Sequence, residues 1–251
     1  MLLAIDVGNT NTVLGLFDGE TLRASWRIKT DARTTADEMI LTLRGLLVGQ
    51  PDITGIALCS TVPAVLREIR VMLERYFDDT PTVIVEPGTK TGVPILTDHP
   101  KEVGADRIVN TMAAFTLFGG PCIVVDFGTS TNLDVVSDKG EFLGGALAPG
   151  IEISLDALAA RAAALRKVEL VRPRSVIGKN TVEALQSGAL YGFAGQVDGL
   201  VDRMREELPE LKAVIATGGL APIVVAESFT ITHHEPDLTL IGLRLVFERN
   251  R

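Results

Sequence analysis

Short apolar runs that end in polar turns mark the first thirty residues of the chain. One run ends at Ile5 and is followed by Asp6 and Gly8, and a second apolar run covers residues 13–17. The dipeptide Asp18-Gly19 then separates the second run from a third stretch, in which Trp26 alternates with polar neighbours as in a strand. Strand, polar turn, strand, glycine turn and strand together predict a β-meander.

The same pattern returns at an offset of 120 residues. The apolar run at residues 122–125 enters Asp126 and Gly128, and a second apolar stretch covers residues 133–136. Gly140 closes the next turn. Later parts of the two halves also correspond, because residues 55–60 and 213–219 are apolar runs that enter a turn before a helix. The sequence therefore predicts a duplicated unit.

Between these strands the apolar residues recur at helical spacing. Thr35 and Glu38 form a capping-box pattern in front of an apolar series that reaches Leu47, and Pro63 fits the first turn of the next helix. Further helices are predicted at residues 65–77, 108–118, 153–165, 181–204 and 238–247. This order predicts two similar α/β lobes, residues 1–118 and 119–251, with a cleft between them.

Composition narrows the class of protein. The chain has 251 residues, is 46% hydrophobic and has a formal net charge of -8, and its lysines and arginines are scattered among acidic residues. This distribution argues against a nucleic-acid surface, and the arginines and lysine at residues 161–174 are interpreted as a solvated helix end and loop. No apolar run reaches the roughly 20 residues of a membrane span. Cys59 and Cys122 are interpreted as buried apolar residues in a reducing compartment, and we expect a cytoplasmic protein.

The first turn carries groups suited to a phosphate. Gly8 lets the backbone approach a ligand closely, and the following residues add hydroxyl and amide donors. Asp6, at a strand end, can hold a hydrated Mg²⁺. The alternative is an ordinary polar hairpin turn, but the second copy at Asp126, Gly128 and Thr129 weakens that interpretation. The chain has no P-loop, so backbone turns and metal would have to bind the phosphates.

Two further motifs suggest ligand contacts. Gly218 and Gly219 follow an apolar strand, where a flat adenine or ribose can lie against the backbone, although such turns are also common without a ligand. Asp106 and Arg107 open a predicted helix. A kinase that phosphorylates an alcohol needs a carboxylate to accept the hydroxyl proton and a cation to bind an anionic substrate, and this pair fits both roles. An aspartate there is also a routine helix N-terminal residue.

Taken together and in order, these motifs resemble type III pantothenate kinases. The resemblance rests on Asp6-Val7-Gly8-Asn9-Thr10, Gly104-Ala105-Asp106-Arg107, Asp126-Phe127-Gly128-Thr129 and Ala216-Thr217-Gly218-Gly219. Matching stretches at residues 144–150, 177–181 and 238–243 extend it over nearly the whole chain. It implies an α/β, duplicated actin-like (ribonuclease H-like) ATPase fold, and a reaction that converts ATP and pantothenate to ADP and 4'-phosphopantothenate, the first step of coenzyme A synthesis.

The resemblance also implies roles for individual residues. Asp106 would be the general base on the substrate hydroxyl. Thr181 would contact pantothenate from a subunit interface, since the family forms homodimers. Asp126 would help to bind a monovalent cation, K⁺ or NH₄⁺, and Asp6 would hold Mg²⁺ through water. The pantothenate site would be lined by Gly104, Ala105, Asp106 and Arg107. The ATP site would comprise Asp6, Val7, Gly8, Asn9, Thr10, Asn11, Thr12, Val13, Gly128, Thr129, Gly218 and Gly219.

Some positions depart from the family pattern. Asn132 stands where many members have threonine, and it keeps a polar side chain. Residues 95–100, upstream of the Gly-Ala-Asp-Arg motif, contain no tyrosine where some members have one, which puts the details of the pantothenate pocket in question. His233 and His234 have no third ligand at metal spacing, so they are interpreted as polar loop residues, and His99 likewise.

The residues alone do not exclude two other functions. One is a kinase for another small alcohol or sugar on the same fold. The other is a non-catalytic relative that acts as a regulator, which loss of Asp106 or of the Gly8 and Gly128 turns would have supported; all of them are present.

Overall fold

The computed structural model describes residues 1–162, 168–208 and 210–251. Contacts within the chain divide it into two compact units. Unit 1 comprises residues 1–92, 99–113 and 239–251, and unit 2 comprises residues 93–98 and 114–238. A single division after residue 118 would place residues 239–251 in the second lobe, whereas here they pack with unit 1. The division after residue 118 stays a prediction.

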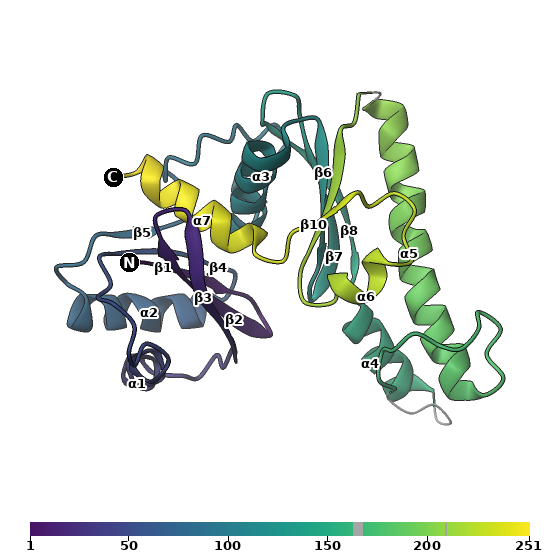
Figure 1. Ribbon diagram of the computed structural model, residues 1–251, viewed down its shortest axis with the longest axis horizontal. Coiled ribbons are helices and arrows are strands. Elements are labelled where there is room, and N and C mark those ends of the chain that lie inside the picture. The colour runs from purple at the N-terminus through teal and green to yellow at the C-terminus, as the bar shows by residue number, and fades with distance from the viewer. Residues whose placement is uncertain (163–167, 209) are drawn as a thin grey trace. The chain divides into compact units, whose positions relative to one another are not determined.

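A five-stranded mixed sheet forms the centre of unit 1, in the order β3-β2-β1-β4-β5 (Figure 1). Strands β1, β2 and β3 form the predicted meander, and β4 and β5 add in parallel. Their bounds are Leu2–Val7, Asn11–Asp18, Thr21–Lys29, Gly55–Ser60 and Thr82–Ile84.

Helices cover both faces of this sheet. On one face, apolar side chains of α1 (Ala36–Leu46) and α2 (Pro63–Tyr76) pack on strand residues that include Ile5 and Leu14. On the other, residues of α3 (Ala105–Phe118) and α7 (Leu238–Arg249) pack on Ala4 and Ala57. A 3-10 turn, Pro100–Glu102, leads into α3. The face that carries Ala4 also carries Asp6, because side chains two residues apart on a strand point the same way.

Unit 2 repeats the same sheet, in the order β10-β9-β6-β7-β8. The meander is formed by β6 (Cys122–Phe127), β7 (Ser130–Val136) and β8 (Phe142–Pro149). The parallel additions are β9 (Ala213–Thr217) and β10 (His233–His234). Helices α4 (Ile151–Arg161), α5 (Thr181–Glu207) and α6 (Ala221–Val225) contribute to its core. The predicted duplication is confirmed at the level of strand order.

Local signals explain several boundaries. Thr35 and Glu38 form the expected capping box on α1, and Pro63 is the first residue of α2. Helix α3 begins at Ala105, so its first turn includes Asp106 and Arg107, which were predicted to open it ahead of the apolar series at 108–118. The predicted helix at 153–165 is observed as α4 to Arg161, and Leu165 lies outside the described residues.

One local prediction was wrong. His233 and His234 form β10 in parallel pairing with β9, where the sequence suggested a loop. The strand has only two residues, too few for an alternation to be visible in the sequence. The His233 ring packs against Phe118 at 4.7 Å, and its Nδ1 lies 2.8 Å from the Thr232 hydroxyl. No cluster of metal-ligating side chains is found in the described ranges.

Two described arginines of the predicted basic segment make ion pairs. Arg172 pairs with Glu227 at 3.1 Å, and Arg174 pairs with Glu183. Arg166 and Lys167 of that segment lie outside the described residues. Within the described ranges, no helix is long and apolar enough to cross a membrane.

Candidate active site

The first candidate turn lies at the end of β1 in unit 1. Gly8 N–H donates to the Asn11 carbonyl at 3.0 Å, and Thr30 N–H donates to the Thr10 carbonyl at 3.0 Å. A Cβ on Gly8 would lie 3.1 Å from the Asn11 carbonyl oxygen, so a larger residue would crowd the turn. Asn9 and Thr10, at the tip, are exposed. The turn is thus held by its own backbone and by the end of β3, with its polar tip open to a ligand.

Asp6 projects from β1 beside groups from three other elements. In the sheet its neighbours are Val13 on β2 and Cys59 on β4, and the Cys59 thiol donates to Asp6 Oδ1 at 3.3 Å. Arg27 on β3 pairs with Val13, so Asp6 and Arg27 share one face of the sheet, two strands apart.

The pKa of Asp6 is raised from 3.8 to about 7. Burial is the main cause, and the negative charge of Asp106 adds to it, while the Cys59 hydrogen bond and the Arg27 charge act in the opposite direction. These interactions place the Asp6 and Asp106 carboxylates close enough to influence each other. Two neighbouring carboxylates with little solvent around them are well suited to a divalent cation.

Asp106 lies in the first turn of α3, as predicted. Its Oδ1 accepts the backbone N–H of Arg107 at 2.9 Å. Burial raises the pKa of Asp106, and the Arg107 N–H and charge oppose that rise. A carboxylate with a raised pKa is a better proton acceptor than an ordinary aspartate, which is the requirement for a general base. A Cβ on Gly104 would lie 2.5 Å from Asp106 Oδ1, so the glycine leaves room for this carboxylate.

The second candidate turn repeats this arrangement in unit 2. Asp126 on β6 has Asn132 and Thr217 as sheet neighbours, as Asp6 has Val13 and Cys59. Gly128 N–H donates to the Ser130 carbonyl at 2.9 Å, and the Thr129 carbonyl accepts from Gly150 N–H at 3.0 Å. Gly128 and Thr129 are exposed at the tip.

Gly218 brings a second loop against this turn. Its φ of +92° lies in the left-handed region, where glycine is favoured, and a Cβ there would collide with Asp126 Oδ1 and the Phe127 backbone. Leu220 N–H donates to the Phe127 carbonyl at 3.4 Å. The structure therefore places Asp126, Gly128, Thr129, Gly218 and Gly219 in two adjacent turns.

An unpaired oxygen lies beside Asp126. Asn132 is 8% exposed, and within the described part of the chain its Oδ1 has no hydrogen-bond partner. Buried side-chain oxygens are normally paired, so the Asn132 oxygen has a lone pair that can serve a bound group. The Asn132 amide oxygen and the carboxylate of Asp126, its partner across the sheet, could both coordinate a monovalent cation.

Thr181 is the first residue of α5 and is exposed. Asn180 caps the helix by accepting Glu183 N–H at 2.9 Å. Thr181 belongs to unit 2 and Asp106 to unit 1, so the contact between Thr181 and the substrate stays a prediction.

Sequence reasoning missed two residues beside Asp6. The sequence predicts Cys59 only as an apolar core residue and predicts no site role for Arg27. Their proximity to Asp6 depends on the register of β1 with β4 and of β2 with β3, which a single sequence does not specify. The signal that was present is the strand alternation around Trp26, which puts Arg27 on the face opposite to that side chain.

Comparison with known proteins agrees with the predicted family. A family model described as type III pantothenate kinase matches residues 2–203. A type III pantothenate kinase of Salinispora arenicola (strain CNS-205) is 68% identical over 251 residues, covering all of both chains.

Solved structures support the fold. A Campylobacter jejuni protein assigned to the Baf family of transcriptional activators has a TM-score of 0.61 and 18% identity, covering 99% of this chain and 98% of its own. The ROK hexokinase from Thermus thermophilus has a TM-score of 0.54 and 13% identity, and the match covers 100% of this chain and 99% of the hexokinase. Because these identities are low, the two matches show only that the chain shares the duplicated, actin-like α/β fold.

Proposed function

Because this chain belongs to the type III pantothenate kinases, we propose that its two aspartate-containing turns and the start of α3 carry out the family's reaction. The enzyme transfers the γ-phosphoryl group of ATP to the primary hydroxyl of pantothenate, giving ADP and 4'-phosphopantothenate in coenzyme A synthesis. The observation that carries the assignment is the pair of carboxylates, Asp6 and Asp106, held close together with raised pKa values.

Asp106 is proposed to be the general base. Its raised pKa lets it accept the hydroxyl proton as the oxygen attacks phosphorus, and the Arg107 N–H fixes its orientation. Gly104, Ala105 and Arg107 would line the pantothenate site, with the Arg107 guanidinium binding the substrate carboxylate. Because residues 95–100, upstream of this motif, contain no tyrosine, we expect Arg107 to account for much of the substrate affinity.

The turn from Asp6 to Val13 is proposed to bind the ATP phosphates through its backbone N–H groups and the polar side chains of residues 9–12. In unit 2, Gly128, Thr129, Gly218 and Gly219 are proposed contacts to the same nucleotide. Arg27 would add a cation beside Asp6, where this chain has no P-loop lysine. The Arg27 side chain is exposed and its charge acts on Asp6, so the guanidinium can reach an anionic group bound there.

Two cations fit the residues present. Asp6, with Asp106 nearby, would hold Mg²⁺, which neutralises charge on the transferred phosphoryl group when bound. Asp126, with the Asn132 amide oxygen opposite, would hold K⁺ or NH₄⁺. We also propose that the enzyme works in the cytoplasm as a homodimer, in which Thr181 contacts pantothenate at a subunit interface.

The direct test is to incubate the purified protein with ATP, Mg²⁺ and pantothenate in potassium or in sodium buffer and to look for phosphopantothenate by mass. We expect product in potassium and little in sodium. Product in both buffers would contradict the cation site. No product from folded protein that binds ATP would favour a kinase for another small alcohol, or a regulatory relative.

A further inference from the structure

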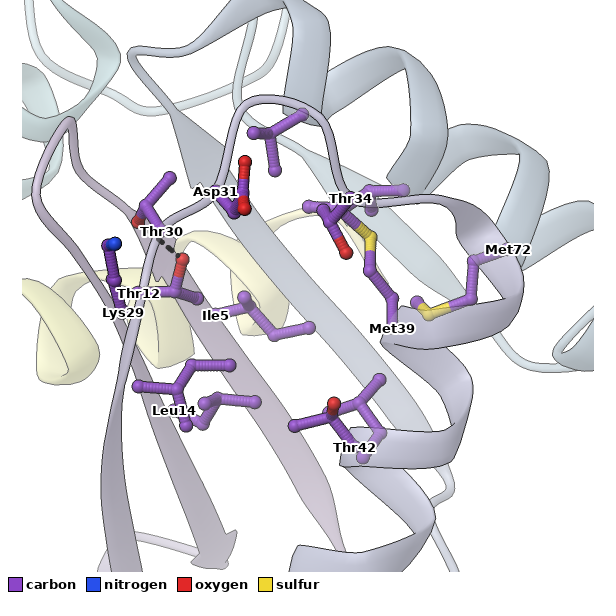
Figure 2. Close-up of a pocket in the computed structure, with 14 residues that line it drawn as sticks. Ile5, Thr12, Leu14, Lys29, Thr30, Asp31, Thr34, Met39, Thr42 and Met72 are labelled. Carbon is purple, nitrogen blue, oxygen red and sulfur yellow. Dashed lines mark hydrogen bonds between the residues drawn. The ribbon is translucent and has the colours of Figure 1, made fainter.

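A cavity of about 230 Å³ lies inside unit 1, away from Asp6 and Asp106, between the sheet and helices α1 and α2 (Figure 2). Ile5 and Leu14 form its wall on the sheet side, and Met39, Leu43, Ile69 and Met72 contribute from the helices. An apolar cavity of roughly 150 Å³ is large enough to bind benzene in another protein, so this one can take a somewhat larger molecule.

The rim of the cavity is polar. Lys29, Thr30 and Asp31 border it where β3 ends, and Thr34 and Thr42 border it near α1. The Thr34 side chain makes no hydrogen bond within the described ranges, and Figure 2 shows its oxygen turned toward the space between Ile5 and Met39. An apolar interior with a few polar groups at one side is the usual make-up of a small-molecule site.

Two features of the lining favour a particular kind of ligand. Lys29 and Asp31 carry opposite charges on the same rim, so neither sign of charge on a ligand is favoured. Burying an ionised group without a dedicated partner is costly, whereas a hydroxyl or amide needs only one hydrogen bond. The two methionines have flexible, polarisable side chains that adapt to the shape of a guest.

We propose that this cavity binds a small uncharged amphiphile, with an apolar body of about six to eight carbons and one hydroxyl or amide that bonds to the threonines of the rim. The site is separate from the proposed ATP and pantothenate contacts, except that Thr12 lines both.

Thr12 connects the cavity to the phosphate turn. Its hydroxyl lies 2.9 Å from that of Thr30, and Thr30 N–H in turn bonds to the Thr10 carbonyl. A ligand in the cavity contacts both threonines, so it restrains the turn that carries residues 8–11. Restraint before nucleotide binding lowers the entropy lost on binding, and the guest therefore strengthens nucleotide affinity. This coupling rests on the proposed function of the turn, whereas the cavity site does not.

The binding test uses the full chain labelled with ¹³C at its five methionine methyl groups and cyclohexanol as the probe. We expect saturable shifts of the Met39 and Met72 resonances, while those of Met1, Met112 and Met204, which do not line the cavity, stay in place. Equal shifts at all five methyls, or shifts that never saturate, would overturn the site. Tighter binding of cyclohexanecarboxylate than of cyclohexanol would overturn the uncharged class.

Matched variants on α1 localise the binding. Thr42→Phe places a ring at the rim and should weaken cyclohexanol binding at least tenfold. Leu41→Phe adds the same ring one residue away, at a side chain that is 69% exposed and outside the cavity, and should change the affinity less than twofold. If Thr42→Phe does not fold, Val65→Leu fills the cavity from α2 and should give the same loss. Unchanged binding in the folded variant contradicts the proposal.

The coupling is tested by titrating ADP with and without saturating cyclohexanol. We expect at least a threefold gain in ADP affinity, with an equal gain in cyclohexanol affinity when ADP is bound. An unchanged ADP affinity overturns the coupling and leaves the cavity site standing. Absence of any ADP binding counts against the proposed function of the turn instead.

Discussion

At the scale of single residues, the ionisation of Asp6 depends on neighbours that the sheet and α3 bring together. Burial and Asp106 raise its pKa to about 7, and Cys59 and Arg27 limit the rise. In the unfolded chain the pKa returns to about 3.8. Between those two values the native state binds a proton that the unfolded state has released, so native stability falls as the pH rises from about 4 to about 7.

Asp6→Asn removes the free-energy cost of ionising this side chain in the native state. In metal-free buffer we expect the variant to be more stable than the parent by roughly 1–3 kcal/mol at pH 8, and the difference to vanish near pH 4. Urea unfolding of both proteins from pH 4 to pH 8 measures this difference in stability. A variant that is less stable at pH 8 would show that Asp6 is held mainly by favourable bonds.

Asp106→Asn keeps the shape of the side chain but removes the proton acceptor. We expect kcat to fall at least about a hundredfold while the affinity for ADP changes little, because the general base acts on the hydroxyl and not on the nucleotide. Asp79→Asn, at an exposed position, is the control. Near-normal turnover of the Asp106 variant would refute its role.

Arg27 offers a separate test of the phosphate site. Arg27→Gln should raise the KM for ATP by about tenfold and weaken ADP binding less, since the γ-phosphate carries the additional charge. Arg27→Lys should recover part of the loss. Arg23→Gln on the same strand breaks only an exposed ion pair with Asp18 and should leave both constants unchanged. Equal effects of the two Gln variants would exclude a specific role for Arg27.

At the scale of elements, one carboxylate joins α5 to the loop between α6 and β10. Asp198 accepts hydrogen bonds from the hydroxyls of Ser228 and Thr230 and from the N–H groups of Phe229 and Thr230. Burial would raise the pKa of Asp198, but these hydrogen bonds outweigh it and the pKa is lowered. They also hold Phe229 at the tip of the loop, where its side chain is 95% exposed.

Asp198→Ala should lower the free energy of unfolding by about 2 kcal/mol, because buried Thr230 loses the shorter of its hydrogen bonds, those to the carboxylate. Asp202→Ala, one turn further along α5, removes an exposed ion pair with Arg205 and should cost less than about 0.5 kcal/mol. Denaturant unfolding compares the two. Similar small losses in both variants would mean that the loop is held by other contacts.

The elements differ in how well the sequence predicts them. Both meanders and α5 have long, regular patterns that the structure confirms. Helix α6, expected after the turn at Gly218, has only five residues, and β10 has two, so neither is long enough for its pattern to repeat twice. The turns around Gly8 and Gly128 were visible in the sequence, whereas Cys59 and Arg27 depend on strand pairing. The cavity depends on how α1 and α2 pack on the sheet, which no local pattern encodes.

At the scale of the whole molecule, unit 2 exposes apolar side chains. Leu147 on edge strand β8 is 67% exposed, and Ile177, shortly before α5, is 70% exposed. Ile153 and Leu158 on α4 are also exposed. Such side chains are typical of interfaces.

We therefore expect the protein to be a dimer by light scattering and Leu147→Arg to shift it toward monomer. Val48→Arg changes a side chain of similar exposure, 79%, in unit 1 and should leave the dimer intact. If Thr181 acts at the interface, the Leu147 variant also loses pantothenate affinity at unchanged ADP affinity. A monomeric parent protein would contradict the proposal.

The return of α7 to unit 1 has a consequence for synthesis on the ribosome. Leu240, Leu243, Val246 and Phe247 pack on Ala4 and Ala57, which are translated more than 180 residues earlier. Helix α3 covers only part of that face, so the nascent chain leaves the remainder of the face exposed until residues 239–251 leave the exit tunnel, when the rest of unit 2 has already been made. The part that is translated first thus completes its folding last, and a chaperone that shields apolar strands has its longest period of access there.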